Sequence, residues 1–393
     1  MKILCAVQFY HPAVGGMEEV VNQLSENWVG QGHEVTVLTS FHPNRLEQSL
    51  NGVKIQSFKI KGNFVVGLSG EVEKCKSFLL NNNFDVVVCF AAQQWAVDIF
   101  LQDGFIKKLN SVKIFVPTGF SGLYNPIYKE YFGRMEEWFH NFNHSVFLSY
   151  NYRDIEFAKK AGVKNYSVIP NGASNIEFNK ERHSYSIGSK FKILHVGNHT
   201  GQKGHKELIQ IYKLAKINNS ELIIIGSKNW KGRCYFSCRL KAGLINLYFR
   251  IRRENKSIKL KTLDRKETIK TFYDANLFLF PSNIECSPIV LFEAMASKTP
   301  FLASSAGNAE EIAEWSKSGE ILDSIKDKYG NTKVDVQKSA ERLSRLSNDK
   351  KSLNDMAVRG YEAWKEQFTW GQLAQQYTSL FSSEMNKKNK ESL

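Results

Sequence analysis

Two glutamates and one lysine stand where charged side chains can do chemistry. Glu285 and Glu293 flank an apolar run in PSNIECSPIVLFEAM, and Lys203 lies among glycines in VGNHTGQKGHKEL. A lysine among glycines before a helix is typical of a phosphate site, because backbone amides and an ammonium group both bind anions. A carboxylate beside such a site can accept hydrogen bonds from sugar hydroxyl groups. The glycines and Lys203 are compatible with either a phosphate site or a loop without a ligand, and the two glutamates with either sugar-binding groups or ordinary loop and helix carboxylates.

A second anion-binding feature is expected where the loop after Glu285 enters a helix. The run from Ile289 to Ser297 has helical length, and the first amides of a helix lack an intrahelical partner. Amides near Ser287–Val290 therefore point out of the helix start, where they can bind an oxyanion. The Gly15–Gly16 pair in FYHPAVGGMEEVV also separates a strand from a helix, and a tight turn without a ligand is the simpler interpretation there.

The cysteines and histidines form no recognisable metal motif. The six cysteines are scattered, which argues against a disulfide framework and indicates a reducing compartment. Cys234 and Cys238 are one helical turn apart, but no further Cys or His cluster follows them, so we predict no metal site. His199 and His205 are expected to be solvated loop residues.

Alternating strands and helices are expected to position these residues. Short apolar segments rich in β-branched residues are typical of a parallel sheet covered by helices. In the first half of the chain we expect strands at Lys2–Val7, Glu34–Leu38, Asp85–Phe90, Val112–Val116 and Ser145–Leu148, with helices at Met17–Gly30 and Tyr152–Ala161. In the second half we expect strands at Phe191–Val196, Glu221–Ile225, Leu277–Phe280 and Phe301–Ala303, with helices at Lys206–Lys216, Lys266–Asp274 and Ile289–Ser297.

The polar segment 170–191 interrupts this alternation and predicts a domain boundary. We expect an α/β protein of two doubly wound parallel-sheet domains, 1–172 and 173–368, facing a cleft, with ligands at the carboxyl ends of strands. A C-terminal helix, 369–384, is expected to pack back on the first domain. The Lys- and Asn-rich end, Asn386–Lys390, is expected to fray.

The net charge of +14 is concentrated in one segment. Residues 228–261 hold eleven basic residues and one acid, and within them a helical pattern at 234–253 places five large apolar residues on one face. The basic residues that flank or follow this face are Arg239, Lys241, Arg250, Arg252 and Arg253. The pattern is typical of an amphipathic helix on an anionic membrane surface, and a core-packed helix with a solvated basic rim is the alternative. We recognise no nucleic-acid module.

The composition bounds the class of protein. A hydrophobic content of 42% is sufficient for large cores and excludes a disordered chain. No run of about 18 uninterrupted apolar residues is present, so no membrane-spanning helix is expected. The apolar run Ile3–Val7 is too short for the core of a secretory signal peptide, which favours a cytoplasmic location.

Five ordered motifs together resemble the retaining, nucleotide-sugar-dependent GT-B glycosyltransferases of glycosyltransferase family 4. Each motif alone is weak, but the set spans nearly the whole chain. The motifs are the Gly-Gly loop at Pro12–Gly16, GHEVTVLT at Gly32–Thr39, VIPNGA at Val168–Ala173, Lys203-Gly204, and the E-x7-E element with EAMASKTPFLAS at Glu293–Ser304. The resemblance implies the GT-B fold of two Rossmann-like domains.

The resemblance also implies roles for the matched residues. Glu285 would contact the donor sugar and Lys203 would neutralise the diphosphate leaving group, which makes these two the expected catalytic residues. Glu293 would bind the ribose hydroxyls, and Gly16 would contact the phosphate–sugar from the first domain. No bound metal is required, and the leaving phosphate accepts the acceptor's proton. The full set expected to bind the donor is Gly15, Gly16, Asn198, Thr200, Lys203, Ser287, Pro288, Ile289, Val290 and Glu293.

Three positions depart from the family pattern. Asn198 stands where many members carry an arginine, and Cys286 stands where a glycine is usual. Thr118-Gly119 replaces a histidine, which leaves this pair as a weak candidate for the acceptor side. The departures favour a subgroup with its own donor or acceptor, and a weakened enzyme is the alternative.

We therefore expect a retaining, metal-independent hexosyltransferase that uses a UDP- or GDP-sugar and no other cofactor. Its acceptor would be a glycan or lipid-linked glycan in bacterial cell-surface polysaccharide biosynthesis, such as capsule or lipopolysaccharide. The protein would be cytoplasmic, with peripheral binding to the inner face of the cell membrane, and no nucleic acid is expected as a partner. One alternative is a catalytically silent GT-B protein that binds nucleotide sugar or scaffolds a glycan assembly complex. Another is a nucleotide-sugar epimerase, which would consume the donor without any acceptor.

Overall fold

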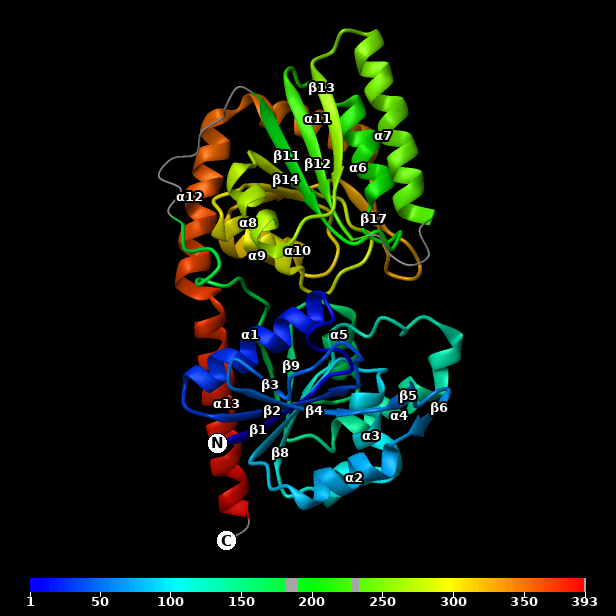
Figure 1. Ribbon diagram of the computed structural model, residues 1–393, viewed down its shortest axis with the longest axis vertical. Coiled ribbons are helices and arrows are strands. Elements are labelled where there is room, and N and C mark those ends of the chain that lie inside the picture. The colour runs from blue at the N-terminus through cyan, green and yellow to red at the C-terminus, as the bar shows by residue number, and fades with distance from the viewer. Residues whose placement is uncertain (181–189, 228–232, 392–393) are drawn as a thin grey trace. The chain divides into compact units, whose positions relative to one another are not determined.

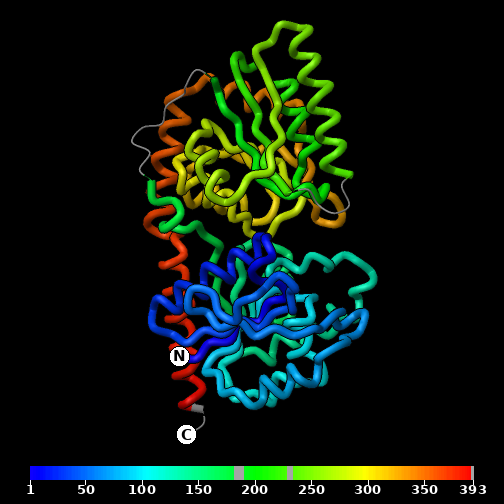
Figure 2. Tube along the Cα trace, viewed as in Figure 1, coloured from blue at the N-terminus to red at the C-terminus, as the bar shows by residue number. Residues whose placement is uncertain are grey.

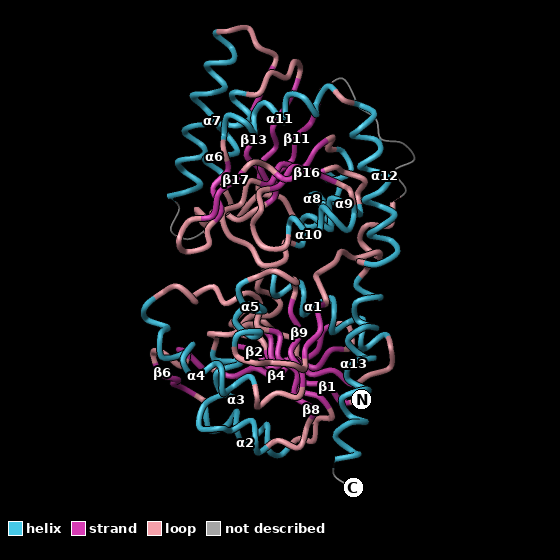
Figure 3. Tube along the Cα trace, turned by 180° about the vertical axis from the view of Figure 1, so that it is seen from behind, coloured by secondary structure: helices cyan, strands magenta, loops and turns pink. Residues whose placement is uncertain are grey.

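The computed structural model describes residues 1–180, 190–227 and 233–391. The chain divides into two compact units, Met1–Asn171 with Trp370–Leu393 (unit 1) and Gly172–Thr369 (unit 2) (Figure 1). In each unit the strands form one layer with helices around it (Figure 3), which confirms the predicted class of two parallel-sheet α/β domains. Lys228 and Lys231 of the basic segment, and residues 181–189 of the expected boundary segment, lie outside the described residues.

Unit 1 is built on a sheet with the strand order β10-β9-β8-β7-β1-β2-β4-β3. Neighbouring strands are parallel except β3 and β4, which are antiparallel. The central strand β7 has the sequence VVVCF and is buried along its whole length, as expected for a strand covered on both faces. The strands are β1 (Lys2–Ala6), β2 (Glu34–Ser40), β3 (Ser49–Leu50), β4 (Val53–Phe58), β7 (Val86–Phe90), β8 (Val112–Val116), β9 (His144–Phe147) and β10 (Tyr166–Val168).

Helices and one hairpin complete unit 1. The strands β5 (Ile60–Asn63) and β6 (Gly67–Gly70) form a separate antiparallel pair. The helices are α1 (Gly16–Gly30), α2 (Val72–Asn81), α3 (Trp95–Leu101), η1 (Gln102–Lys108), η2 (Pro126–Tyr128), α4 (Lys129–Phe139), α5 (Arg153–Lys160) and α13 (Trp370–Glu391).

Unit 2 repeats the arrangement with a parallel sheet of order β13-β12-β11-β14-β15-β16 and a small antiparallel pair, β17-β18. The strands are β11 (Phe191–Val196), β12 (Ser220–Ile225), β13 (Lys256–Lys261), β14 (Leu277–Phe280), β15 (Phe301–Ala303), β16 (Gly319–Ile321), β17 (Ser324–Lys326) and β18 (Thr332–Val334). The helices are α6 (His205–Leu214), α7 (Arg233–Ile251), α8 (Arg265–Asp274), α9 (Ile289–Ala296), α10 (Ala309–Ser316), α11 (Val336–Asn348) and α12 (Lys350–Gln367).

Strands at the sheet margins were harder to predict than central ones. Strand β13 has the sequence KSIKLK, and its lysines count toward the basic segment, yet it pairs in register with β12. Its apolar residues alternate with polar ones because an edge strand has fewer covering helices. The expectation that Asn386–Lys390 frays is wrong: α13 extends to Glu391, and the ammonium of Lys388 donates to the backbone and side-chain oxygens of Asn110.

The C-terminal helix α13 packs against α1 within unit 1. Figure 2 shows the last segment of the chain returning to the N-terminal segment, and the contacts centre on Trp28. The ring of Trp28 is fully buried, meets Tyr377 and Phe381 edge-on at 5.7 and 5.4 Å, and donates its indole N–H to the carbonyl of Ala374 at 3.1 Å. Edge-to-face aromatic packing and a buried hydrogen bond together fix this helix on the unit.

Trp28→Ala is expected to lower the free energy of unfolding by about 3–5 kcal/mol, because a large buried ring and its packing are lost. Urea unfolding of the whole chain, followed by fluorescence and circular dichroism, measures the change. Leu80→Ala, at an exposed position of α2 in the same unit, is the control and is expected to shift stability by only about 0.5 kcal/mol. Equal shifts in the two variants would contradict a stabilising α1–α13 contact.

Candidate active site

The candidate site in unit 2 lies where two neighbouring parallel strands end. Strands β11 and β14 pair in parallel, so the loops that follow Val196 and Phe280 leave the same edge of the sheet. The first loop contains Lys203 and the second contains Glu285. Ligands of doubly wound sheets bind at this edge, because the helix N-termini and the loops converge there.

Gly204 brings the two loops into contact. Its φ of +63° lies in the left-handed region, and a Cβ atom there would lie within van der Waals overlap of the Pro281 carbonyl oxygen. Only glycine combines this conformation with so close an approach. A hydrogen bond also joins the loops: the Gln202 carbonyl accepts from the Asn283 amide at 2.9 Å.

The predicted catalytic residues meet as an ion pair. The Lys203 ammonium lies 2.6 Å from Oε1 of Glu285, and the hydroxyl of the buried Ser282 donates to the same oxygen at 2.7 Å. The Glu285 side chain is 10% exposed and that of Lys203 is 27% exposed, so the pair is largely shielded but reachable from solvent. The backbone of Gly307 packs against the same loop. A Cβ atom at its φ of +64° would collide with the Cys286 carbonyl, so only glycine allows this contact.

The start of α9, where the sequence predicts an anion cradle, follows Glu285 closely along the chain. Pro288 is the N-cap residue, and the first helical amides belong to Ile289 and Val290. The hydroxyl of the buried Ser287 accepts a hydrogen bond from the Asn308 amide group at 3.2 Å, which fixes the turn before the helix. The sequence placed the α9 start correctly, since Ile289 is its first residue.

Glu293 has a partner that sequence reasoning missed. Its carboxylate is buried, and Oε1 lies 2.5 Å from Nη1 of Arg265, the first residue of α8. The same guanidinium contacts both carboxylate oxygens of Glu177, at 2.9 and 2.6 Å. The three residues are far apart in the chain, so no local pattern could have indicated the cluster.

The remaining donor-site candidates of unit 2 lie on the loop after β11. Asn198 and Thr200 are exposed. The side-chain oxygen of Asn198 accepts from the amide and the hydroxyl of Ser227 at 3.3 and 2.7 Å. Asn198 therefore ties this loop to the one after β12 and does not supply the positive charge that an arginine would.

His199 and His205 correct another expectation. Both were predicted as solvated loop residues, but they are 4% and 2% exposed and their rings stack at 4.2 Å. The expectation that no further ligand lies near Cys234 and Cys238 is also wrong, because the fold brings His199 to them. Residues 35 positions apart in sequence meet here, which the spacing alone could not indicate.

In unit 1, the glycine pair stands at the start of α1. Gly16 is the first helical residue, and the space where its Cβ would lie is open to 4 Å. At Gly15 a Cβ would meet a carboxylate oxygen of Glu18, which folds back over the turn. Burial raises the pKa of Glu18. The position at the start of α1 where a bound anion could lie is therefore next to the Glu18 carboxyl group.

Thr118 and Gly119 lie on a strained turn after β8. Thr118, Gly119 and Phe120 all have positive φ, of 59°, 98° and 48°. The left-handed region disfavours a β-branched residue such as Thr118, and strain of this kind is common at functional sites. The turn is held by the buried Asp154, which accepts from the Gly119 amide at 2.8 Å, and burial raises the pKa of Asp154 to about 6.

Two family models match consecutive parts of the chain. The model described as Glycosyltransferase Family 4 matches residues 14–174, and the model described as Glycosyl transferases group 1 matches residues 177–363. The structure is similar to sucrose-phosphate synthase from Thermosynechococcus elongatus, with a TM-score of 0.76 at 16% identity over 97% of this chain and 98% of that one. It is also similar to Anabaena HepE in complex with UDP-glucose, with a TM-score of 0.74 at 15% identity over 98% of this chain and 100% of that one.

The chain is a glycosyltransferase of the GT-B type. Among curated proteins it is 27% identical to the uncharacterized glycosyltransferase MJ1607 of Methanocaldococcus jannaschii, over 81% of this chain and 84% of that protein. It is 23% identical to the capsular polysaccharide biosynthesis glycosyltransferase CapM of Staphylococcus aureus, over 56% of this chain and 57% of that protein.

The predicted site residues of this glycosyltransferase fall into two sets. Lys203 and Glu285 come together in unit 2, which also holds the start of α9, within the part matched by the Glycosyl transferases group 1 model. Gly15, Gly16, Thr118 and Gly119 belong to unit 1, within the part matched by the other model.

The Arg265–Glu293 pair can be tested by a double-mutant cycle. Arg265→Met leaves the buried Glu293 carboxylate without its guanidinium partner, which is expected to cost about 2–3 kcal/mol, less than for a fully buried pair because Arg265 is partly exposed. Adding Glu293→Gln removes the buried charge and is expected to recover more than half of that loss. Thermal and urea unfolding of the single and double variants measure the coupling. Additive losses would show that the two side chains do not interact.

Proposed function

We propose that this protein is a retaining glycosyltransferase that transfers a sugar from a nucleoside-diphosphate sugar to a glycan or lipid-linked acceptor, without a metal at the transferred group. The observation that carries the proposal is the Lys203–Glu285 pair, 2.6 Å apart, beside the start of α9. A cation, helix amides and a carboxylate in one place match the needs of a diphosphate leaving group attached to a sugar.

Each of these groups would have its own role in sugar transfer. Departure of the nucleoside diphosphate builds negative charge on phosphate oxygens, and the Lys203 ammonium with the amides of Ile289 and Val290 would stabilise that charge where it develops. Glu285 would then accept hydrogen bonds from the donor sugar. In the resting protein Lys203 and Glu285 neutralise each other, so the incoming diphosphate would draw the ammonium partly away from the carboxylate.

Glu293 would bind the ribose of the donor. A carboxylate offers about four acceptor positions, so the contact with Arg265 leaves capacity for two ribose hydroxyls. Arg265 would hold the carboxylate in one orientation, because the guanidinium is itself fixed by Glu177. Binding would then require little reorganisation of Glu293.

The nucleotide and the pathway are proposed from the relatives. HepE is similar to this chain and its structure contains UDP-glucose, so a UDP-sugar is the first donor to test and a GDP-sugar the second. The similarity to CapM supports a role in cell-surface polysaccharide biosynthesis. For unit 1, Gly15 and Gly16 are proposed to contact the phosphate–sugar, and Thr118 and Gly119 to lie near the acceptor.

Glu285→Gln is expected to keep the affinity for the nucleoside diphosphate and to slow sugar transfer by about 100-fold or more, because only a contact to the reacting sugar is lost. Lys203→Met is expected to weaken nucleoside diphosphate binding by about tenfold or more, since a charge-assisted contact disappears. Calorimetric titration and release of nucleoside diphosphate in an acceptor panel measure the two effects. Glu314→Gln, at an exposed position of α10, is the control.

The same titrations are run with a chelator and then with magnesium. Unchanged binding and transfer in chelator support metal independence, and a strict magnesium requirement would overturn it. Product anomers determined by NMR decide whether the configuration is retained. Transfer by Glu285→Gln at the wild-type rate would remove Glu285 from the proposed role.

A catalytically silent, nucleotide-sugar-binding protein is the second candidate. Asn198 favours it, because this residue bonds Ser227 and brings no positive charge to the phosphate loop. This candidate predicts donor binding with no transfer to any acceptor and no donor consumption. A nucleotide-sugar epimerase would consume donor without an acceptor, and the same assay separates all three.

We further propose that α7 rests on an anionic membrane surface. One face of this helix, with Cys238, Ala242, Ile245 and Phe249, is buried in the unit 2 core. On the opposite face the side chains at least half exposed are Phe236, Leu240, Leu244, Leu247 and Ile251. The core-packed alternative thus accounts for only one of the two apolar faces.

The basic residues around the exposed apolar face of α7 are the reason for proposing an anionic membrane as its partner. Arg239 and Arg250 lie on one side of it, Lys241 lies on the other, and Arg252 and Arg253 follow the helix. Apolar side chains bordered by cations suit the boundary between acyl chains and anionic headgroups. Among the described residues no helix is long and apolar enough to cross a bilayer, so the proposed contact is peripheral.

Leu240→Gln/Leu244→Gln is expected to weaken binding to phosphatidylcholine vesicles containing phosphatidylglycerol by tenfold or more, because burial of two leucines contributes about 1.5–3 kcal/mol each. Vesicle sedimentation at several salt concentrations measures binding, which is expected to fall as salt rises. Leu80→Gln/Leu214→Gln, at exposed positions of α2 and α6, is the control. Equal binding to vesicles without phosphatidylglycerol, or concentration-dependent dimerisation through this face, would contradict the membrane proposal.

A further inference from the structure

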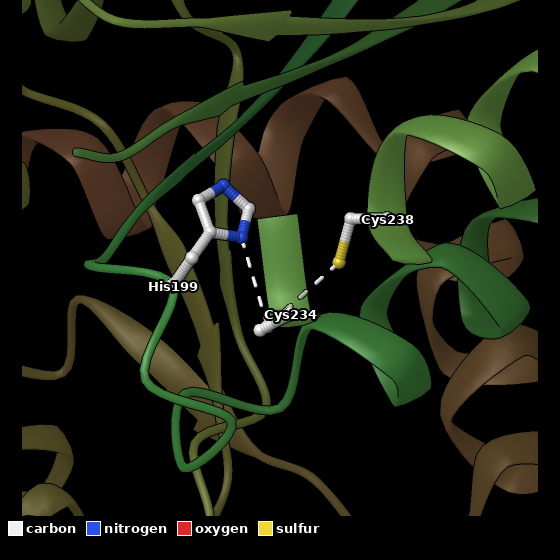
Figure 4. Close-up of side chains that lie close together, drawn as sticks. All are labelled: His199, Cys234 and Cys238. Atoms are coloured by element: carbon white, nitrogen blue, oxygen red, sulfur yellow. Dashed lines mark hydrogen bonds between the residues drawn. The ribbon is translucent and has the colours of Figure 1, made fainter. Parts of the chain in front are cut away.

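Helix α7 also carries two thiols that meet an imidazole from the loop after β11. Figure 4 shows the ring of His199 directed toward Cys234, with the sulfur of Cys238 turned to the same point from the next helical turn. Nδ1 of His199 lies 3.7 Å from Sγ of Cys234, and the two sulfurs lie 4.0 Å apart. The three potential ligand atoms all lie within 4.8 Å of one another.

These separations are close to those of a tetrahedral zinc site. With Zn–S of about 2.3 Å and Zn–N of about 2.1 Å, tetrahedral angles place two sulfurs about 3.8 Å apart and a sulfur and a nitrogen about 3.6 Å apart. Two of the three separations exceed these values by about 0.2 and 0.1 Å. The third, from His199 to Cys238, is within 4.8 Å, so these side chains would have to rotate to bring all three ligands around one ion.

A candidate fourth ligand is His205, which lies outside this group of three and hydrogen-bonds the Gly197 backbone, so its ring would have to rotate toward a bound ion. Nδ1 of His205, the first residue of α6, lies 4.0 Å from Sγ of Cys234, and its ring stacks on that of His199. Cys238, His199 and His205 are each less than a tenth exposed, and Cys234 is half-buried. Tyr235 meets the His199 ring edge-on at 5.1 Å and restricts its orientation. Two thiolates and two imidazoles form a ligand set typical of structural zinc.

We propose that His199, Cys234 and Cys238, with His205 as the fourth ligand, bind one Zn²⁺ ion that fixes the loop 197–204 to α7. Binding forms two Zn–S and two Zn–N bonds and releases the two thiol protons to solvent. The resulting cluster of one dication and two thiolates carries no net charge, so it adds no net charge near Lys203. Its role is structural and independent of the metal-free chemistry proposed for the transferred group.

A zinc ion at this site would also affect the loop 197–204, which is proposed to bind the donor. His199 lies between Asn198 and Thr200, and Lys203 and Gly204 complete the same loop. Tying His199 to α7 would reduce the motion of these residues before a donor arrives, which lowers the ordering cost of binding. This consequence for donor affinity rests on the proposed function, whereas the metal site itself does not.

The metal site is tested by titrating reduced, metal-free whole chain with Co²⁺ and Zn²⁺. We expect one ion per chain, thiolate-to-cobalt absorption in the near ultraviolet, and visible bands of tetrahedral Co²⁺ that Zn²⁺ displaces. Cys234→Ser, Cys238→Ser and His199→Ala are each expected to weaken Zn²⁺ binding by 100-fold or more. Cys75→Ala, which removes a buried thiol of unit 1, is the matched control and should bind as wild type does.

Hydrogen exchange tests the fixing of the loop. Zn²⁺ is expected to slow amide exchange across residues 197–204 in wild type and in Cys75→Ala, and to leave it unchanged in Cys234→Ser. Circular dichroism of each metal-free variant shows whether it folds, and the half-buried Cys234 position keeps the test interpretable if Cys238→Ser does not fold.

Three results would overturn the proposal. Octahedral cobalt spectra or binding that survives Cys234→Ser would place the ion elsewhere. A Cys234–Cys238 disulfide in protein purified without reductant, seen as a 2 Da mass loss, that persists under cytosol-like reducing conditions would show that the thiols form a stable disulfide and do not bind zinc. Zinc bound at this site with unchanged exchange in 197–204 would refute the fixing of the loop. If wild type and Cys75→Ala bind zinc but transfer no sugar, the result would instead count against the proposed function.

Discussion

The approach of Gly204 to the Pro281 carbonyl joins the two loops on which the candidate donor site depends. No other residue type tolerates both the left-handed backbone and the contact distance, so the lysine loop and the glutamate loop can pack together only with glycine at this position. The hydrogen bond from the Asn283 amide to the Gln202 carbonyl then fixes the register of the loops. The Lys203–Glu285 contact is a consequence of this packing.

The two carboxylates of the site are stabilised in different ways. Glu285 has a flexible lysine and the Ser282 hydroxyl as partners, whereas Glu293 is more deeply buried and faces the rigid fork of Arg265. A lysine can follow a moving charge, while a guanidinium anchored by a second carboxylate holds one geometry. This difference agrees with the proposed roles, in which Lys203 beside Glu285 follows the leaving group and Glu293 keeps a fixed contact with the ribose hydroxyls.

Helix α7 combines three environments along 19 residues. One face completes the core of unit 2, the opposite face exposes large apolar side chains between cations, and the first turns present two thiols to the donor loop. The helix lies between β12 and β13 in the sequence and packs against α6, whose first residue is His205. The proposed membrane contact and the loop that carries Lys203 would therefore share one rigid element.

The sequence by itself determined the alternation of strands and helices, the parallel-sheet class, and the start of α9, because apolar periodicity and helix capping are local properties. The charged candidates Lys203, Glu285 and Glu293 were also visible in their local contexts. Only the tertiary structure decided the partners: Arg265 on Glu293, the packing of Gly204 on Pro281, and the meeting of His199 with Cys234 and Cys238. Each of these contacts joins residues separated by more than 25 positions, and their encounter depends on the order in which strands assemble in the sheet. That order is set by the packing of the whole unit, which no short stretch of sequence encodes.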